Sequence, residues 1–249
     1  MYGLTGFPLG HSFSKKYFSE KFAIESVDAE YNLFPLADIR DLKQLIKSEP
    51  LLKGLNVTIP YKKAVIEYLD SISPEAQAIG AVNTIGIQRH GDQIHLKGWN
   101  TDAPAFESEI LDFAGIQAGN ALVLGNGGAA NAACFVLKKL GWEIRQVVRR
   151  HASEFENSIL YSHIGKEIMD DTRLIVNATP VGMFPETQGI PEIPVEFLSS
   201  RHFIFDMVYN PEVTRLMEAG NQRGAKIRNG LGMLYKQADL AWDIWKGKG

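Results

Sequence analysis

Short apolar runs alternate with segments of helical period along the chain. Apolar runs bounded by Gly, Pro or Asn predict strands over residues 2–7, 30–35, 55–57, 120–124, 143–148, 174–176 and 203–205. Apolar residues spaced three and four apart predict helices from about residue 13 and over 39–48, 102–114, 129–140 and 232–245. Residues 84–88 and 93–97 flank the turn-forming sequence His90-Gly91-Asp92 and predict a hairpin. This alternation is typical of an α/β fold with a mainly parallel sheet.

The pattern becomes a strict alternation of strand and helix near residue 100, which predicts a domain boundary there. A chain of 249 residues can form one large domain or two smaller ones, and the change of pattern favours two.

Composition and charge exclude several classes of function. The net charge is −3 and no long run of Lys or Arg occurs, so we expect no nucleic-acid partner. No apolar run approaches the roughly 20 residues of a membrane helix, and the first residues do not resemble a signal peptide. The single cysteine, Cys134, excludes an internal disulfide and a cysteine-built zinc site, and the six His residues are too scattered for a metal site. We therefore expect a cytoplasmic enzyme without a metal.

A glycine-rich turn joins the apolar strand 120–124 to the helix that follows it. Glycines in Gly125-Asn126-Gly127-Gly128-Ala129 permit a tight turn, and the start of the helix adds partial positive charge. Such turns also occur as plain connectors, but the strand–turn–helix context favours a dinucleotide.

The end of the next predicted strand indicates which dinucleotide. An NAD enzyme has an acidic residue there for the ribose hydroxyl. Here the strand ends in Arg149-Arg150-His151, and two guanidinium groups suit a 2′-phosphate. The alternative is a solvated basic turn; together with the glycine-rich turn, the arginines favour NADP.

Several other polar residues have both a structural and a chemical interpretation. Residues 56–62 are expected to open a helix with Pro60 in its first turn, where Lys62 is either a surface lysine or an acid–base group. Asp102, Ser12 and Ser14 suit helix capping as well as ligand binding. Gln237 lies near the apolar face of the last helix, where its amide needs a partner from the backbone or from a polyhydroxylated ligand.

Eight segments together resemble the shikimate dehydrogenase family, in the family's order and over nearly the whole length of the chain. They are residues 10–14 (GHSFS), 56–62 (NVTIPYK), 80–84 (GAVNT), 100–102 (NTD), 125–129 (GNGGA), 177–183 (NATPVGM), 206–211 (DMVYNP) and 230–237 (GLGMLYKQ). Three features depart from the family's usual pattern. Lys15 stands where many members have proline, Arg149-Arg150-His151 replaces Asn-Arg-Thr, and the chain is somewhat short.

The resemblance implies two α/β domains around a cleft. Residues 1–100 with 233–249 would bind substrate and carry the chemistry, and residues 101–232 would form a Rossmann-like NADP-binding domain. Lys62 and Asp102 match the family's catalytic pair. The implied substrate-binding residues are Ser12, Ser14, Thr58, Asn83, Tyr209 and Gln237. The implied cofactor-binding residues are Gly125, Asn126, Gly127, Gly128, Ala129, Arg149, Arg150, Asn177, Thr179, Met207 and Gly230.

The implied activity is the reversible NADPH-dependent reduction of 3-dehydroshikimate to shikimate, in aromatic amino-acid biosynthesis, by a monomer or homodimer. A quinate or quinate/shikimate dehydrogenase is the nearest alternative. A non-catalytic NADP-binding module would not need the Lys62 and Asp102 pair, and a folate-type dehydrogenase would not need residues 177–183 and 230–237.

Overall fold

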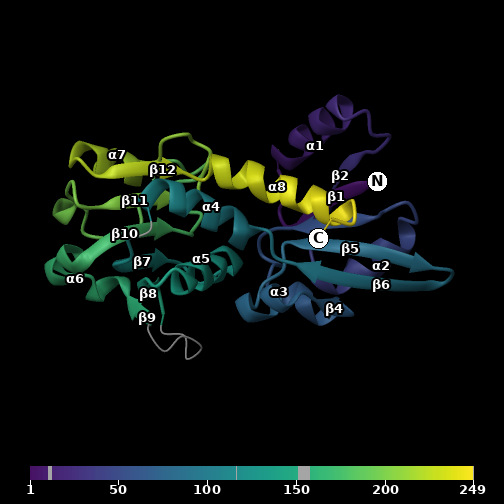
Figure 1. The fold of residues 1–249 in the computed structure, drawn as a ribbon, viewed down its shortest axis with the longest axis horizontal. Coiled ribbons are helices and arrows are strands. Elements are labelled where there is room, and N and C mark those ends of the chain that lie inside the picture. The colour runs from purple at the N-terminus through teal and green to yellow at the C-terminus, as the bar shows by residue number, and fades with distance from the viewer. Residues whose placement is uncertain (11–12, 116, 151–157, 249) are drawn as a thin grey trace. The chain divides into compact units, whose positions relative to one another are not determined.

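The computed structural model describes residues 1–10, 13–115, 117–150 and 158–248 (Figure 1). Ser12 and His151, singled out above, lie outside the described residues. The chain divides into two compact units, of which the first is Met1–Thr101 with Ala238–Gly249 and the second is Asp102–Gln237. Each unit is built around its own six-stranded sheet.

The sheet of the first unit has the strand order β2-β1-β3-β5-β6-β4. Its strands are β1 (Tyr2–Gly6), β2 (Tyr31–Pro35), β3 (Gly54–Val57), β4 (Ser71–Ile72), β5 (Thr84–His90) and β6 (Gln93–Trp99). Strands β1, β2 and β3 are parallel, whereas β5 and β6 form the predicted hairpin and β5 runs antiparallel to β3. The carboxyl ends of β1 and β3 therefore meet at one edge of the sheet.

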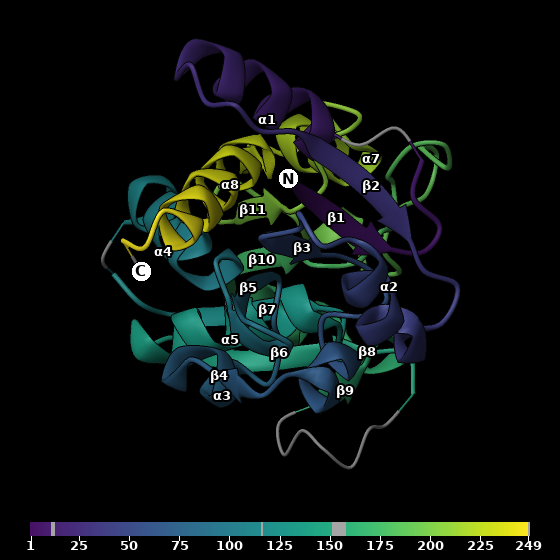
Figure 2. The same ribbon diagram turned by 90° about the vertical axis from the view of Figure 1, so that its right-hand side faces the viewer.

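Helices cover both faces of this sheet. On one face, α1 (Phe13–Ile24) and the end of α8 (Leu231–Trp245) lie side by side (Figures 1 and 2). Phe22 and Trp242 pack on Tyr2, and Phe18 packs on Phe22. The other face packs against α2 (Leu42–Ser48), α3 (Pro74–Ile79) and the 3₁₀ segments η1 (Ile39–Asp41) and η2 (Ala64–Tyr68).

The second unit has a wholly parallel sheet in the order β12-β11-β10-β7-β8-β9. Its strands are β7 (Asn120–Leu124), β8 (Glu143–Val148), β9 (Ser158–Leu160), β10 (Thr172–Asn177), β11 (Phe203–Asp206) and β12 (Lys226–Asn229). Counted within the unit, this is the order 6-5-4-1-2-3 of a doubly wound dinucleotide-binding sheet. The prediction of an α/β chain with a Rossmann-like second domain is confirmed.

The central strands of this sheet are buried on both faces, as their continuous apolar runs predict. On one face, Phe106 and Phe113 of α4 (Asp102–Ala114) make edge-on contacts with Phe205 and Phe203, and α5 (Gly128–Lys139) packs beside α4. The other face carries α6 (Lys166–Asp171), α7 (Arg215–Gln222) and the 3₁₀ segments η3 (Tyr161–His163) and η4 (Val195–Phe197). None of the helices that the structure describes is long and apolar enough to cross a membrane.

Residues 39–48 are helical as predicted, although the first turn, η1, is a 3₁₀ helix that continues directly into α2 and is capped by the Asp38 side chain, which accepts a hydrogen bond from Arg40 N. One local prediction is wrong. Residues 56–62 do not open an α-helix: Pro60 and Lys62 lie in turns, and the 3₁₀ segment η2 begins only at Ala64. The carbonyl of Lys62 accepts the N–H of Val82 at 2.7 Å, so tertiary structure uses a group that a helix would need.

Candidate functional site

The glycine-rich turn links β7 to α5 as predicted. Gly125 has a φ of 113°, which favours glycine, and a Cβ there would lie 3.1 Å from the carbonyl oxygen of Ala178. The N–H of Gly125 donates to Val147 O at 2.9 Å, and its carbonyl accepts Gln146 Nε2 at 2.8 Å. Strand β8 therefore fixes the first residue of the turn from both sides.

The turn leaves space where a phosphate would sit. Gly127 is the N-cap of α5, no side chain caps the helix there, and a Cβ on Gly127 would meet no atom within 4 Å. A twelve-residue helix presents backbone N–H groups and partial positive charge at this end. Since backbone can approach a ligand closely here, the residues present fit the pyrophosphate of a dinucleotide.

Arg149 and Arg150 follow β8 directly, and both are exposed. Strand β8 thus ends in two cations where an NAD enzyme has an acidic residue. Burial raises the pKa of the Tyr161 phenol, and the positive charge of Arg149 opposes this shift. The described part of this strand end fits a 2′-phosphate.

Asn177 and Thr179 meet at the carboxyl end of β10. The Oδ1 atom of Asn177 accepts the backbone N–H of Thr179 at 3.1 Å and the Thr179 hydroxyl at 2.6 Å. The methyl of Thr179 and the carbonyl of Ala178 lie against Gly125, so this loop supports the glycine-rich turn.

Met207 and Gly230 meet at the carboxyl end of β11. The N–H of Met207 donates to Asn177 O at 2.9 Å, and the N–H of Gly230 donates to Val208 O at 3.2 Å. A Cβ at Gly230 would lie 2.3 Å from Met207 O, so only glycine fits. The second unit thus brings its predicted cofactor residues at β7, β10 and β11 to one edge of the sheet.

The first unit carries Thr58, Lys62 and Asn83 near the carboxyl ends of β1 and β3. The N–H of Thr58 donates to Thr5 O at 2.9 Å, and both Thr58 and Lys62 are half-buried. Ser14 lies in the first turn of α1 and forms a hydrogen bond with the Tyr31 phenol, whose pKa is raised well above its usual value by burial.

A buried polar network holds Asn83, and sequence reasoning missed most of its members. The Tyr31 hydroxyl donates to Asn56 Oδ1 at 2.8 Å, and Asn56 Nδ2 donates to Thr84 Oγ1 at 3.2 Å. Asn83 Nδ2 donates to Thr101 Oγ1 at 2.9 Å, while Asn83 Oδ1 accepts Thr101 N–H at 2.7 Å. Buried polar residues inside the motifs 56–62 and 80–84 were the available signal.

The remaining predicted residues belong to the second unit. Asp102 opens α4 and is only 4% exposed. Burial raises the pKa of the half-buried Tyr209. Gln237 is half-buried, and its Nε2 donates to Leu234 O of the same helix at 2.9 Å. Its amide therefore finds a backbone partner, one of the two possibilities that the sequence left open.

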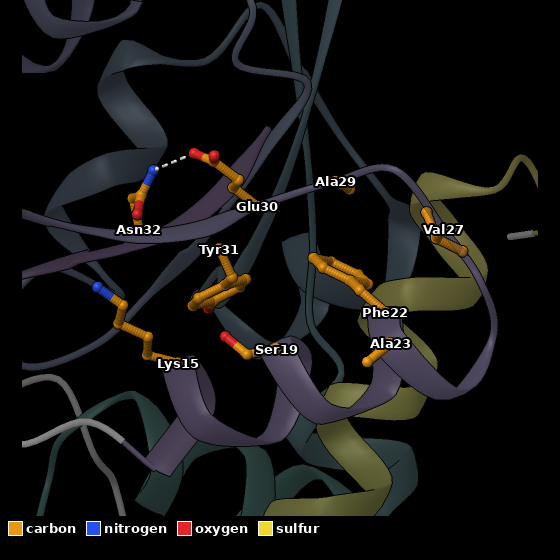
Figure 3. A pocket seen from close by; sticks show the side chains of 9 residues that line it. All are labelled: Lys15, Ser19, Phe22, Ala23, Val27, Ala29, Glu30, Tyr31 and Asn32. Atoms are coloured by element: carbon orange, nitrogen blue, oxygen red, sulfur yellow. Dashed lines mark hydrogen bonds between the residues drawn. The ribbon is translucent and has the colours of Figure 1, made fainter.

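A separate hollow of about 400 Å³ lies between α1 and β2 (Figure 3). Phe22 and Tyr31 supply its aromatic side chains, and its polar ones come from Lys15, Ser19, Glu30 and Asn32. None of the predicted site residues that the structure describes lines this hollow. Among the described residues, no group of three or more His, Cys, Asp or Glu could hold a metal ion.

Known proteins resemble this chain over its whole length. The family model for the shikimate dehydrogenase substrate binding domain matches residues 4–85. The shikimate dehydrogenase (NADP(+)) of Methanosphaera stadtmanae is 35% identical over 99% of this chain and 91% of its own. That of Thermus thermophilus is 38% identical over 99% of this chain and 92% of its own.

Solved structures also match this chain over nearly its whole length. A shikimate 5-dehydrogenase of Thermus thermophilus, in complex with NADP(H) and shikimate, matches with a TM-score of 0.84 at 34% identity and covers 99% of this chain and 93% of its own. The shikimate dehydrogenase of Aquifex aeolicus matches with a TM-score of 0.87 at 29% identity, over 99% and 92% of the two chains.

Proposed function

The chain belongs to the shikimate dehydrogenase family, and on that basis we propose which residues of this NADP-dependent oxidoreductase bind the cofactor, bind the substrate and transfer the proton. It interconverts 3-dehydroshikimate and shikimate, in aromatic amino-acid biosynthesis. The observation that carries this function is the match over 99% of the chain to a structure in complex with both NADP(H) and shikimate. The cofactor geometry of the second unit supports it independently.

The second unit binds NADP through the edge of its sheet. The glycine-rich turn Gly125-Asn126-Gly127-Gly128-Ala129 and the start of α5 hold the pyrophosphate, and Arg149 with Arg150 holds the 2′-phosphate. Met207 and Gly230 lie beside the nicotinamide, and Asn177 and Thr179 belong to the cofactor loop. NADPH supplies the hydride when it is bound.

Lys62 and Asp102 carry out proton transfer. Lys62 Nζ donates a proton to the ring carbonyl oxygen during reduction and accepts it from the hydroxyl in the reverse direction. Its ammonium also stabilises the negative charge that develops on that oxygen. Asp102 orients the reacting hydroxyl and tunes the reactivity of Lys62. Because the two groups act as a pair, a pH–rate profile would report apparent pKa values of the pair.

The substrate's other hydroxyls and its carboxylate bind to Ser12, Ser14, Thr58, Asn83, Tyr209 and Gln237. Of these, Ser12 lies outside the described residues. The network through Asn56 and Thr101 holds Asn83 in one orientation, which lowers the entropic cost of binding a small rigid ligand. We propose further that the enzyme acts in the cytoplasm, as a monomer or homodimer, without a nucleic-acid partner.

A steady-state assay with four pairs of reactants tests this function. Purified protein is given shikimate or quinate with NADP or NAD, and the nicotinamide absorbance is followed. We expect kcat/KM for shikimate with NADP to exceed the other three values by at least about tenfold. A preference for quinate or NAD would make the chain a quinate or quinate/shikimate dehydrogenase. The absence of turnover in every pair would leave a non-catalytic NADP-binding module.

A further inference from the structure

Asp206 is a fully buried carboxylate at the end of β11, and the chemistry above does not use it. Its Oδ1 accepts Asn177 Nδ2 at 2.9 Å and the N–H of Val208 at 3.0 Å, and its Oδ2 accepts the Thr214 hydroxyl at 2.7 Å. All three donors are neutral. A buried carboxylate with neutral partners is costly to the fold, because its charge is removed from water without a cation to compensate.

The first of these hydrogen bonds connects the carboxylate, through Asn177, to the loop after β10. An ionised carboxylate only accepts hydrogen bonds, so the amide nitrogen of Asn177 must face it. The amide oxygen then faces Thr179, where it accepts both the backbone N–H and the hydroxyl. Thr179 and Ala178 in turn lie against Gly125. Asp206, together with Val181 O, which accepts the same Nδ2 at 3.3 Å, therefore holds the orientation of an amide on which the shape of this loop depends.

The second hydrogen bond connects the carboxylate to the backbone beside Met207. The carboxylate holds the N–H of Val208, Asn177 O holds the N–H of Met207, and Val208 O accepts the N–H of Gly230. The N–H groups of Met207 and Val208 thus both donate to one pair of residues, Asn177 and Asp206. The third hydrogen bond comes from the Thr214 hydroxyl. Thr214 is also the N-cap of α7, where its hydroxyl accepts the N–H of Met217.

We propose that Asp206 is a positioning residue for NADP, whose carboxylate holds Asn177 and the Met207–Val208 backbone in the geometry that binds the nicotinamide half. This rests on the proposed function, since the placing of the nicotinamide beside Met207 comes from it. The costly buried carboxylate is retained because a neutral acceptor would hold these donors less strongly.

The test measures cofactor affinity and stability separately. NADPH fluorescence titrations give Kd for wild type, Asp206→Asn and Asp206→Ala, and thermal unfolding without ligand gives the stability of each at pH 8. We expect Kd to rise at least about fivefold in Asp206→Asn and further in Asp206→Ala, because the amide keeps one acceptor and alanine keeps none. Asp206→Asn should be at least as stable as wild type, and KM for shikimate should change less than KM for NADP.

The matched control is Asp171→Asn, which removes an exposed carboxylate of the same unit bonded to Arg145, and its Kd should stay within twofold of wild type. A folded Asp206→Asn variant that binds NADPH within twofold of wild type would overturn this inference but leave the proposed function standing. Failure of the wild type itself to bind NADPH would instead overturn the proposed function.

A second pair of variants serves if the Asp206 variants do not fold. Thr214→Val removes the donor to Oδ2 but lies in neither cofactor loop. We expect Thr214→Val to raise the Kd for NADPH about threefold. Thr214→Ser keeps the hydroxyl, so its Kd should stay near the wild-type value. Equal affinities of the valine variant and the wild type would contradict transmission through Asp206.

Discussion

Burial raises the pKa of Asp206 to about 6, against a usual value of 3.8. The folded chain therefore binds more protons than the unfolded chain between these two values, and the stability that this provides is present below pH 3.8 and lost as the pH rises through about 6. Since each pKa unit corresponds to about 1.4 kcal/mol, wild type should lose up to about 3 kcal/mol relative to Asp206→Asn between pH 4 and pH 8. Urea unfolding of both proteins at several pH values measures this difference. A difference that does not vary with pH would show that Asp206 titrates normally.

A second prediction at the residue scale concerns the choice of cofactor. Arg150→Ala should raise KM for NADP by about tenfold or more and change KM for NAD less than twofold, because only NADP carries the 2′-phosphate. Arg145→Ala, on the same strand but paired with Asp171, is the control and should leave both constants near wild type. Steady-state kinetics with each cofactor makes the comparison, and equal effects of Arg150→Ala on both cofactors would remove it from the phosphate site.

At the scale of elements, the end of α8 is held to the first unit by contacts that permit little adjustment. Trp245 Nε1 donates to Ile85 O at 3.0 Å, and its ring lies over Gly54, where a Cβ would come within 2.2 Å of Nε1. Gly54→Ala must displace this ring or β3, and we expect it to lower the free energy of unfolding by about 1–3 kcal/mol. Gly119→Ala, where the nearest atom would be 3.5 Å away, should change it by less than about 0.5 kcal/mol. Urea unfolding distinguishes the two, and equal effects would mean that the fit at Gly54 is loose.

The elements that the sequence predicts well are those whose hydrophobic pattern lasts for several residues. Strand β7 and helix α4 agree with the prediction at both ends, because a buried run and a long amphipathic segment each specify one structure. The short elements β4, α6 and β12 contain neither a continuous apolar run nor a repeated helical spacing, so the sequence does not predict them. The α-helix predicted after β3 fails for another reason: the carbonyl of Lys62 bonds to Val82, twenty residues away.

The same limit applies to the site. Sequence motifs identify side chains that chemistry needs, such as Lys62, but not the partners that orient them. Tyr31, Asn56 and Thr101 form the network around Asn83, and Gln146 holds Gly125, because the fold brings separate strands together. Asp206 lies within a recognised motif, yet only its burial and its three donors show what it holds.

At the scale of the whole molecule, the described cofactor-binding residues of the proposed function all belong to the second unit, whereas its catalytic and substrate-binding residues come from both units. The second unit holds the predicted cofactor turn, arginines and loops on one parallel sheet, and the first unit holds Lys62, Thr58 and Asn83 on another. Most of these residues follow the carboxyl ends of parallel strands, where ligands of open α/β sheets bind. Asn83 instead precedes the antiparallel β5, and its carbonyl accepts the N–H of Val57 at the end of β3. A defect in proton transfer should therefore be separable from a defect in cofactor binding.

Lys62→Ala tests this central claim most directly. The variant's kcat for shikimate oxidation with NADP and its Kd for NADPH are measured together, with the neighbouring Lys63→Ala as the control. We predict that kcat falls by at least about a thousandfold while Kd stays within twofold of wild type, and that Lys63→Ala leaves both near wild type. A fall in kcat of less than about tenfold would show that Lys62 is not the acid–base group of this enzyme.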